Sequence, residues 1–135
     1  MSQFGVKRNK YDITFSKFIK LRDRGVCQRC GKSKEHMETS HLFSRGKSKA
    51  LRCDPSNACL KCNSCHRWWH SNPIAAAEWL KSVIGELKYY DLMRRANTPT
   101  KFSQWEKDFQ RSELQEQIKR MEAGEILPCF NPIYR

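Results

Sequence analysis

Apolar residues first recur at helical spacing after a polar and basic segment that shows no clear period. Residues 1–13 form this segment, which predicts a flexible arm. Phe15 and Phe18 then fall on one helical face and predict a helix over residues 14–24. Residues 26–63 lack a helical period and are rich in Cys, Gly, Ser, Asn and Pro. They predict loops and short strands, with METSHLF and ALRC as the best strand candidates.

The second half of the chain is predicted to be helical, with breaks at Asn, Gly and Pro. A helix over residues 64–70 must end near Asn72, because the residue before a proline avoids the helical region. Asn72 and Pro73 then cap and begin a further helix, which is expected to divide at Gly85 and to end near residue 96. A last helix over residues 103–123 begins with an S-x-x-E capping box. Its apolar stripe fits packing on its own domain or pairing with a second copy equally well.

The charge balance favours a partner that is itself strongly negative. The chain has 26 Lys and Arg residues against 14 Asp and Glu residues, for a net charge of +12. A small protein this basic attracts polyanions, with nucleic acid first among them, and its affinity should fall steeply with salt. The sequence has no apolar run long enough for a membrane span and no secretory core near its start. We therefore expect a cytoplasmic protein that does not bind membranes.

The chain has seven cysteines, an odd number, so they cannot all pair in internal disulfides. In a reducing cytosol, short regular spacings favour metal ligands over disulfides. Two C-x-x-C pairs, Cys27 with Cys30 and Cys62 with Cys65, offer the four thiolates of a tetrahedral structural Zn²⁺ site. Cys59 also stands three residues before Cys62, so the second pair has an alternative. Redox-active or simply buried thiols are the competing interpretation.

Two histidines follow the last of these cysteines, with a spacing of four. If His66 and His70 lie on a helix they share a face, and two neutral imidazoles can hold one divalent ion. A zinc ion bound by four cysteines has no free coordination position for these histidines. This favours a second metal ion, bound by the histidines, that keeps coordination positions open. A single site built from Cys and His ligands together is the alternative.

Basic and aromatic residues surround the isolated His41 and the histidine pair. After His41 come Arg45, Lys47, Lys49 and Arg52, and Arg67 stands beside the pair. Contacts with DNA phosphates are the functional interpretation of these charges, and a solvated surface is the simpler one. The helical tryptophans are expected to be mostly core residues: Trp68, Trp69, Trp79 and Trp105. For the first two, stacking on exposed bases is the alternative.

Several short motifs, in order, resemble the HNH nucleases, and more closely the phage lambda NinG (Rap) recombination proteins. They are the helix FSKFIKLRD before CQRCG, then METSHLFSRG, ALRCDPSN, CNSCH and a helix containing IGE. Together they cover about residues 15–90, and their order is more specific than any one of them. The resemblance implies an α+β protein with a small ββα-metal core and a structural zinc, flanked by helices at both ends. It assigns residues 14–96 to the nuclease domain and residues 97–135 to a helical extension and tail.

The resemblance also implies roles for individual residues. His41 resembles the general base, and Asn57 resembles the asparagine that fixes the loop or touches the metal. The histidine pair resembles the ligands of the catalytic ion, and the four cysteines those of the zinc that some members bind. Ser40 stands where many HNH proteins have a ligand. Glu38, on the same strand face, is the substitute ligand that the NinG-like proteins imply, and an ordinary exposed glutamate is the alternative. Cys59 departs from the family pattern and is assigned no role beyond packing.

The implied function is that of a metal-dependent DNA endonuclease. A neutral histidine would take a proton from water, and one divalent ion, Mg²⁺, Mn²⁺ or Zn²⁺, would stabilise the phosphate and the leaving oxygen. The expected products carry 5′-phosphate and 3′-hydroxyl ends. The resemblance implies phage recombination or DNA processing on branched or structured DNA, in the cytoplasm of a bacterial host. The alternative is a non-catalytic zinc-ribbon DNA-binding or adaptor protein, whose histidines only bind metal or pack.

Overall fold

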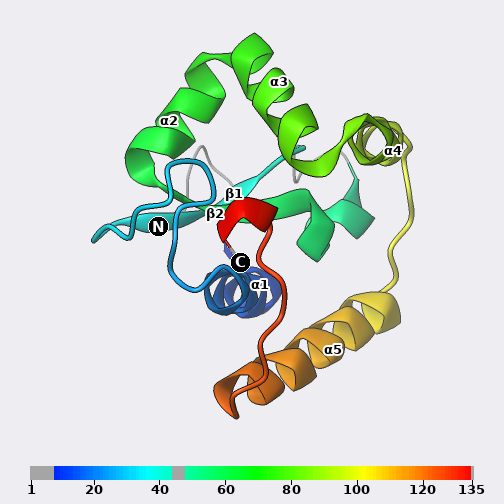
Figure 1. Ribbon diagram of the computed structural model, residues 1–135. Coiled ribbons are helices and arrows are strands. Elements are labelled where there is room, and N and C mark those ends of the chain that lie inside the picture. The colour runs from blue at the N-terminus through cyan, green and yellow to red at the C-terminus, as the bar shows by residue number, and fades with distance from the viewer. Residues whose placement is uncertain (1–7, 44–47, 135) are drawn as a thin grey trace.

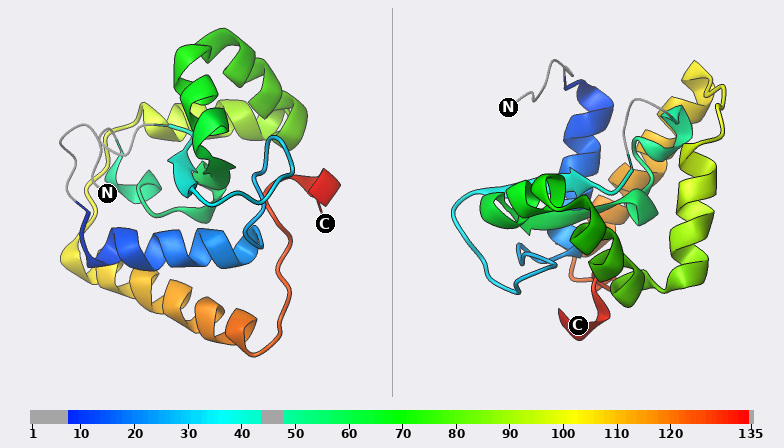
Figure 2. Two further views of the ribbon diagram at one scale, coloured as in Figure 1. Left: turned by 90° about the vertical axis from the view of Figure 1, so that its left-hand side faces the viewer. Right: turned by 90° about the horizontal axis from the view of Figure 1, so that it is seen from above.

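A two-stranded antiparallel sheet lies at the centre of the computed structural model, which describes residues 8–43 and 48–134. It pairs β1 (Met37–His41) with β2 (Ala58–Cys62). Helix α1 (Lys10–Arg22) packs on one face with α5 (Gln104–Glu122) beside it, while α2 (Asn63–Ser71), α3 (Pro73–Ile84) and α4 (Glu86–Ala96) lie on the other side (Figures 1 and 2). Short 3₁₀ segments complete the described chain: η1 (Lys49–Leu51), η2 (Pro55–Asn57) and η3 (Pro132–Tyr134). The architecture is α+β, and none of the described helices is long and apolar enough to cross a membrane.

Helix α1 begins at Lys10 rather than near residue 14, because Asn9 and Asp12 form a capping box. Asn9 Oδ1 accepts hydrogen bonds from two backbone N–H groups of the first turn, at 3.0 and 3.1 Å. In return, Asp12 Oδ2 accepts one from the Asn9 N–H at 3.0 Å. These reciprocal bonds satisfy groups that would otherwise lack partners. The first turn of α1 therefore occupies part of the expected arm, of which residues 1–7 lie outside the described residues.

The second strand differs from the one that the sequence predicts. ALRC, residues 50–53, is predicted to be extended, but these residues form the end of η1 and the turn after it. The partner of β1 is Ala58–Cys62 instead. Every residue of β2 is buried, so it lacks the alternation by which a half-exposed strand is recognised. The prediction of a strand in METSH is confirmed by β1.

The sheet separates two hydrophobic cores. Against α1 and α5, the first contains Phe15, Phe18, Ile19, Ala58, Leu60, Leu114 and Ile118. Against α3 and α4, the second contains Leu42, Leu51, Cys59, Leu80, Tyr89 and Leu92. Cys59 is fully buried in this second core. Its place in the cysteine-rich run is therefore explained by packing.

The apolar stripe of α5 is buried only in its second half. Leu114 lies in the core against α1, but Trp105 and Phe109 are 71% and 51% exposed and stack on each other with ring centroids 5.3 Å apart. The prediction that Trp105 is a core residue is wrong. At this end, α5 turns a polar side to α1, where the Tyr11 hydroxyl donates a hydrogen bond to Asp108 Oδ1 at 2.6 Å. The apolar pair therefore faces away from the domain.

Asn57 holds the loop between the two strands. Its Oδ1 accepts a hydrogen bond from the Phe43 N–H at 3.0 Å, and its Nδ2 donates to the carbonyls of Phe43 and Leu51, each at 3.1 Å. The side chain is fully buried, so losing any of these bonds would leave a polar group without water. These three bonds join the Asn57 side chain to both ends of the segment that contains residues 43–51.

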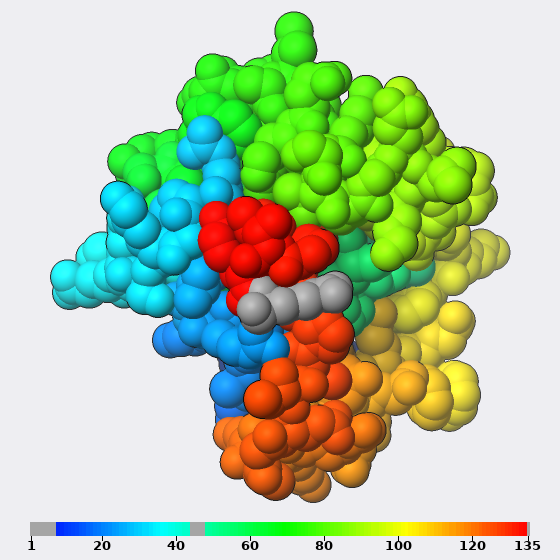
Figure 3. Space-filling view, in the orientation of Figure 1, coloured from blue at the N-terminus to red at the C-terminus, as the bar shows by residue number. Residues whose placement is uncertain are grey.

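The C-terminal tail is fastened onto the loop that carries the first two cysteines. Figure 3 shows the tail, in red, between the blue-to-cyan segment and the green helices. Asn131 donates hydrogen bonds to Gln28, from its N–H to Oε1 at 2.7 Å and from its Nδ2 to the carbonyl at 2.9 Å. The ring of Tyr134 covers Gly31, where an added Cβ would come within 2.7 Å of the ring. Because Gly31 also has a φ of +77°, both the space and the backbone require glycine there.

Candidate metal centres

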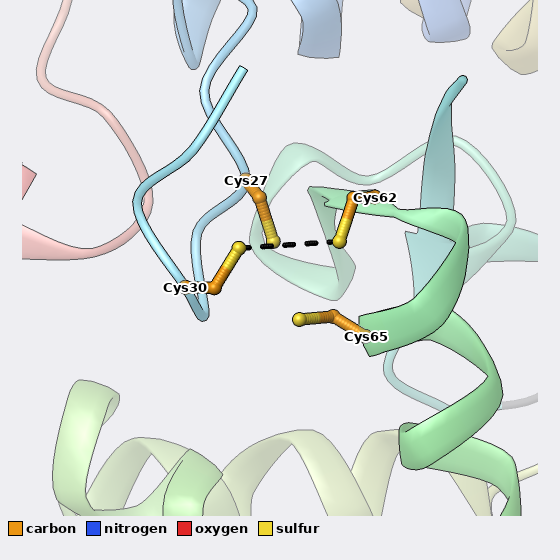
Figure 4. Close-up of side chains that lie close together, drawn as sticks. All are labelled: Cys27, Cys30, Cys62 and Cys65. Atoms are coloured by element: carbon orange, nitrogen blue, oxygen red, sulfur yellow. Dashed lines mark hydrogen bonds between the residues drawn. The ribbon is translucent and has the colours of Figure 1, made fainter. Parts of the chain in front are cut away.

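Four cysteine side chains converge from a loop, a strand and a helix (Figure 4). Cys27 and Cys30 lie between α1 and β1, Cys62 ends β2, and Cys65 lies in the first turn of α2. Their sulfur atoms all lie within 4.8 Å of one another. Within the described part of the chain, no other group of three or more Cys, His, Asp or Glu side chains gathers its ligand atoms so closely. The structure thus brings together the two C-x-x-C pairs and leaves Cys59 outside the cluster.

The spacing of the sulfurs suits a tetrahedral zinc ion. With Zn–S bonds of about 2.3 Å, two sulfurs of a tetrahedral site are about 3.8 Å apart, and the Sγ atoms of Cys30 and Cys62 are 3.9 Å apart. Arg29 adds positive charge beside the thiols, since its Nη1 lies 3.4 Å from Cys65 Sγ. Its guanidinium also lies 3.5 Å from the centroid of the Trp68 ring, which fixes its position. Four soft sulfur donors at this spacing fit a structural zinc.

Three thiols of the cluster, those of Cys30, Cys62 and Cys65, have pKa values that depart from the usual one. Burial would raise the pKa of Cys62, but hydrogen bonds from Ser64 and from Cys65 outweigh it and lower this pKa to about 6. Burial is the main cause that raises the pKa of Cys65 to about 12, although the hydrogen bond from Arg29 opposes it. Burial also raises the pKa of Cys30. A thiolate at Cys62 therefore disfavours further thiolates beside it, and a divalent cation would remove this penalty.

Zinc binding is expected to strengthen by at least about 100-fold per pH unit through the neutral range, because zinc must displace protons from at least Cys30 and Cys65. A thiol with a raised pKa keeps its proton until the pH approaches that pKa, so the affinity for zinc continues to increase as the pH rises. Below a pH of about 6, Cys62 takes up a proton too, and the dependence becomes steeper. Competition with a chromophoric chelator at about pH 6, 7 and 8 measures this slope. An affinity independent of pH would contradict binding by these thiols.

The two histidines predicted as metal ligands face each other on α2. The Nε2 atoms of His66 and His70 are 3.2 Å apart. Two nitrogens bound to one tetrahedral ion at about 2.0–2.1 Å would be about 3.3–3.4 Å apart. Glu38 Oε1 lies 2.9 Å from the other ring nitrogen of His66, Nδ1. A carboxylate accepts only, so Nδ1 carries the proton and Nε2 keeps its lone pair, which is how proteins orient histidines that bind metals.

The surroundings of His70 favour its neutral form. Partial burial lowers the pKa of His70, and the nearby His66 and Lys61 lower it further, while Glu38 acts in the opposite direction. An imidazole must be neutral to bind a metal ion. The lowered pKa therefore keeps His70 in the ligand form at neutral pH.

Lys61 is a residue of this region that the sequence did not indicate. It lies in β2, opposite Glu38, and its side chain is fully buried. Its Nζ donates a hydrogen bond to Ser40 Oγ at 2.9 Å and lies 4.2 Å from the centroid of the Trp69 ring. A single lysine in a short strand normally indicates a solvent-facing position, so no signal in the sequence could have found it.

His41 lies on the other face of the sheet from the histidine pair. Successive residues of a strand point to opposite faces. Glu38 reaches α2, whereas the His41 ring packs on the α1 side, with its centroid 5.6 Å from that of Phe15. Its Nε2 lies 2.8 Å from the carbonyl oxygen of Arg52, so Nε2 carries the proton and Nδ1 is the basic nitrogen. The structure thus orients His41 without bringing it to the histidine pair.

The basic residues predicted to contact DNA occupy different environments. Arg52 forms a bidentate ion pair with the buried Asp12. Its Nε donates to Asp12 Oδ1 at 2.9 Å and its Nη2 donates to Asp12 Oδ2 at 2.7 Å. This pair ties the segment after η1 to α1, a structural role that the sequence did not indicate. Lys49 and Arg67 are exposed. Two further predicted DNA-contacting residues, Arg45 and Lys47, lie outside the described residues.

Comparison with known protein families finds a match over most of the chain. A family model described as Bacteriophage Lambda NinG protein matches residues 7–125. This span contains the four clustered cysteines, the histidine pair, Glu38, His41 and Asn57. No curated protein and no solved structure matches the chain.

Proposed function

The chain belongs to the bacteriophage lambda NinG protein family, and from this premise we propose that it is a metal-dependent DNA endonuclease acting in phage recombination. The observation that carries the proposal is the 3.2 Å separation between the Nε2 atoms of His66 and His70, with Glu38 held against His66 Nδ1. Few protein ligands and open positions for water and substrate distinguish a catalytic ion from a structural one. The net charge of +12 supports DNA as the substrate.

Helix α2 connects the two proposed centres. Cys65 lies in its first turn, and His66 and His70 follow on the same helix. A zinc bound by the cysteines would tie this end of α2 to the loop that carries Cys27 and Cys30. The sheet restrains the helix from the other side through the contact between Glu38 and His66. The structural zinc would therefore hold the histidine pair in place without taking part in the reaction.

In the proposed reaction, a water oxygen attacks the phosphorus and the bond from phosphorus to the 3′ oxygen breaks, leaving 5′-phosphate and 3′-hydroxyl ends. A divalent ion, when bound, would stabilise charge on the phosphate and on the leaving oxygen, which takes its proton from solvent. His66 and His70 would hold that ion through Nε2, and Glu38 would keep His66 in the required tautomer. His41 is proposed as the general base that receives the water proton on Nδ1, which requires the attacking water to lie at the end of β1, within reach of both the His41 ring and the ion. The exposed Arg67 is proposed to contact a phosphate.

The position of His41 favours a second candidate function. Its ring packs against Phe15, on the face of the sheet opposite the histidine pair. This arrangement fits a zinc-containing DNA-binding or adaptor protein that does not cleave its partner. Such a protein would hold one zinc tightly and would show no cleavage with any divalent metal.

Titration of the zinc-loaded protein with Mn²⁺ is expected to reveal a second ion bound to each chain. His66→Ala and His70→Ala should each abolish this binding and leave the zinc in place. Glu38→Ala should weaken it by about 10–100-fold, the usual effect of removing the partner behind a histidine ligand. Electron paramagnetic resonance or calorimetry measures the free and bound Mn²⁺.

The matched control is His36→Ala, which removes an exposed histidine outside the pair. If Glu38→Ala abolished Mn²⁺ binding as completely as His66→Ala, Glu38 would be a direct ligand of the ion. The absence of a second ion in the wild-type protein would contradict the proposed catalytic site.

A further inference from the structure

A pocket beside the histidine pair shares His70 with the proposed metal site, but its other lining residues have no part in the metal chemistry proposed above. It has a volume of about 290 Å³, and its lining includes Phe43, Trp69, His70, Ala77, Leu80 and Tyr89. Ligand pockets of proteins are roughly 300–1,000 Å³ in volume. The volume of this pocket lies just below that range, so it suits one small ring system and not an extended molecule.

Three aromatic side chains from separate parts of the fold line the pocket together with aliphatic residues. Phe43 follows β1, Trp69 lies on α2 and Tyr89 lies on α4. The rings of Phe43 and Tyr89 have centroids 5.9 Å apart and are tilted by 54°, while the buried Leu80 contributes an aliphatic surface. Aromatic side chains bind the flat faces of nucleobases by stacking, whatever the base. The lining therefore suits a planar aromatic ligand.

The buried Lys61 holds one of these walls in place. Its Nζ, anchored by Ser40 Oγ at 2.9 Å, lies 4.2 Å from the centroid of the Trp69 ring. Trp79 packs edge-on against the same ring, with centroids 6.2 Å apart. An ordered ring loses little conformational entropy when a ligand stacks on it. These contacts give the buried lysine a role that the metal site does not require.

We propose that this pocket binds one unpaired nucleobase of the DNA substrate, next to the phosphate held at the histidine pair. The inference rests on the proposed function and names its substrate class. His70 links the two sites, because its Nε2 faces His66 while the residue also lines the pocket. A paired base is stacked inside the duplex and reaches such a pocket only at the cost of unpairing, whereas an unpaired base avoids most of that cost. The structure therefore assigns a preference for DNA that carries an unpaired base.

The test uses a DNA duplex with a single bulged 2-aminopurine, in a buffer that contains Ca²⁺ in place of Mg²⁺ or Mn²⁺. The wild-type protein is expected to quench the fluorescence of the bulged base by stacking. It should also bind the bulged duplex about 10-fold more tightly than a fully paired one, the effect of one base–aromatic stack. Both quantities come from one fluorescence and anisotropy titration.

Ala77→Phe fills the pocket from α3 and is expected to abolish the quenching and bring the affinity ratio close to one. Ala75→Phe is the matched control, because Ala75 is exposed on the same helix and does not line the pocket. This variant should keep both the quenching and the preference for the bulged duplex. Zinc content and circular dichroism establish that each variant is folded. If Ala77→Phe fails to fold, Ala77→Leu fills the same space with a smaller side chain.

Equal affinity of the wild-type protein for bulged and paired DNA would overturn the inference, and so would quenching retained in a folded pocket-filling variant. The readout is binding, so it separates this inference from the proposed cleavage. Pocket-dependent quenching in a protein that never cleaves DNA would support the base site and overturn the endonuclease. A protein that cleaves DNA but neither quenches the bulged base nor prefers the bulged duplex would support the endonuclease and overturn the base site.

Discussion

Cys62→Ala is expected to remove the bound zinc and to lower the free energy of unfolding by at least about 4 kcal/mol. Cys62 ends β2, and its thiol meets those of the Cys27–Cys30 loop and of α2. A structural zinc contributes on the order of 10–16 kcal/mol in small zinc domains, while a whole domain is stable by only about 5–15 kcal/mol. The loss of the site is therefore comparable with the total stability. Native mass spectrometry measures the zinc, and denaturant unfolding measures the stability.

Cys59→Ala is the matched control for this change. Cys59 lies in the same strand and is as fully buried as Cys62, but it packs in the second core and lies outside the cluster. The control variant is expected to keep one zinc and to lose about 1–2 kcal/mol, the ordinary effect of a small core truncation. Equal losses of zinc and of stability in the two variants would show that the cluster is not the zinc site.

His66→Ala is expected to slow DNA cleavage by at least about 10³-fold, because it removes one of two ligands of an ion that supplies several kcal/mol of transition-state stabilisation. The cysteine-bound zinc should remain, since the His66 ring takes no part in the cluster. Single-turnover cleavage under saturating protein measures the rate independently of DNA affinity. A rate within a few-fold of the wild type would remove the histidine pair from the mechanism.

His41→Ala is the companion variant in the same assay. As a general base, His41 should contribute about 10²–10⁴-fold to the rate. The loss should shrink as the pH rises, because hydroxide then replaces the base. Full activity at neutral pH would show that the ring packed against Phe15 is structural, and that another group activates the water.

The helical part of the fold was predictable because its signals are local. Ser103 and Glu106 form the expected capping box of α5. Gly85, with a φ of +86°, separates α3 from α4 where the sequence places the break. Strand β2 was not predictable, because both of its faces are covered, one by the distant helix α1 and the other by the helices that follow the strand. Burial of this kind removes the alternation that would have revealed the strand.

The candidate site also has parts that local sequence signals indicate and parts that depend on the folded structure. Cysteines three apart can share a turn or knuckle, and two histidines four apart share a face of a helix, so their spacing indicates candidate metal ligands. Spacing did not decide whether Cys62 pairs with Cys59 or with Cys65, and the folded chain leaves Cys59 outside the cluster. The contact between Glu38 and His66 depends on how α2 packs on β1, and the sequence leaves the role of Glu38 open. The place of Lys61 and the aromatic pocket depend on side chains from several elements. Only the folded chain brings these together.

Cleavage of supercoiled plasmid and of branched DNA by the zinc-loaded protein in Mn²⁺ tests the proposed endonuclease most directly. Nicked or linear products with 5′-phosphate and 3′-hydroxyl ends are expected from the wild-type protein, and none from His66→Ala under the same conditions. A wild-type protein that holds its zinc and binds DNA, yet yields no product with Mg²⁺, Mn²⁺ or Zn²⁺, would contradict the endonuclease and favour the DNA-binding or adaptor function.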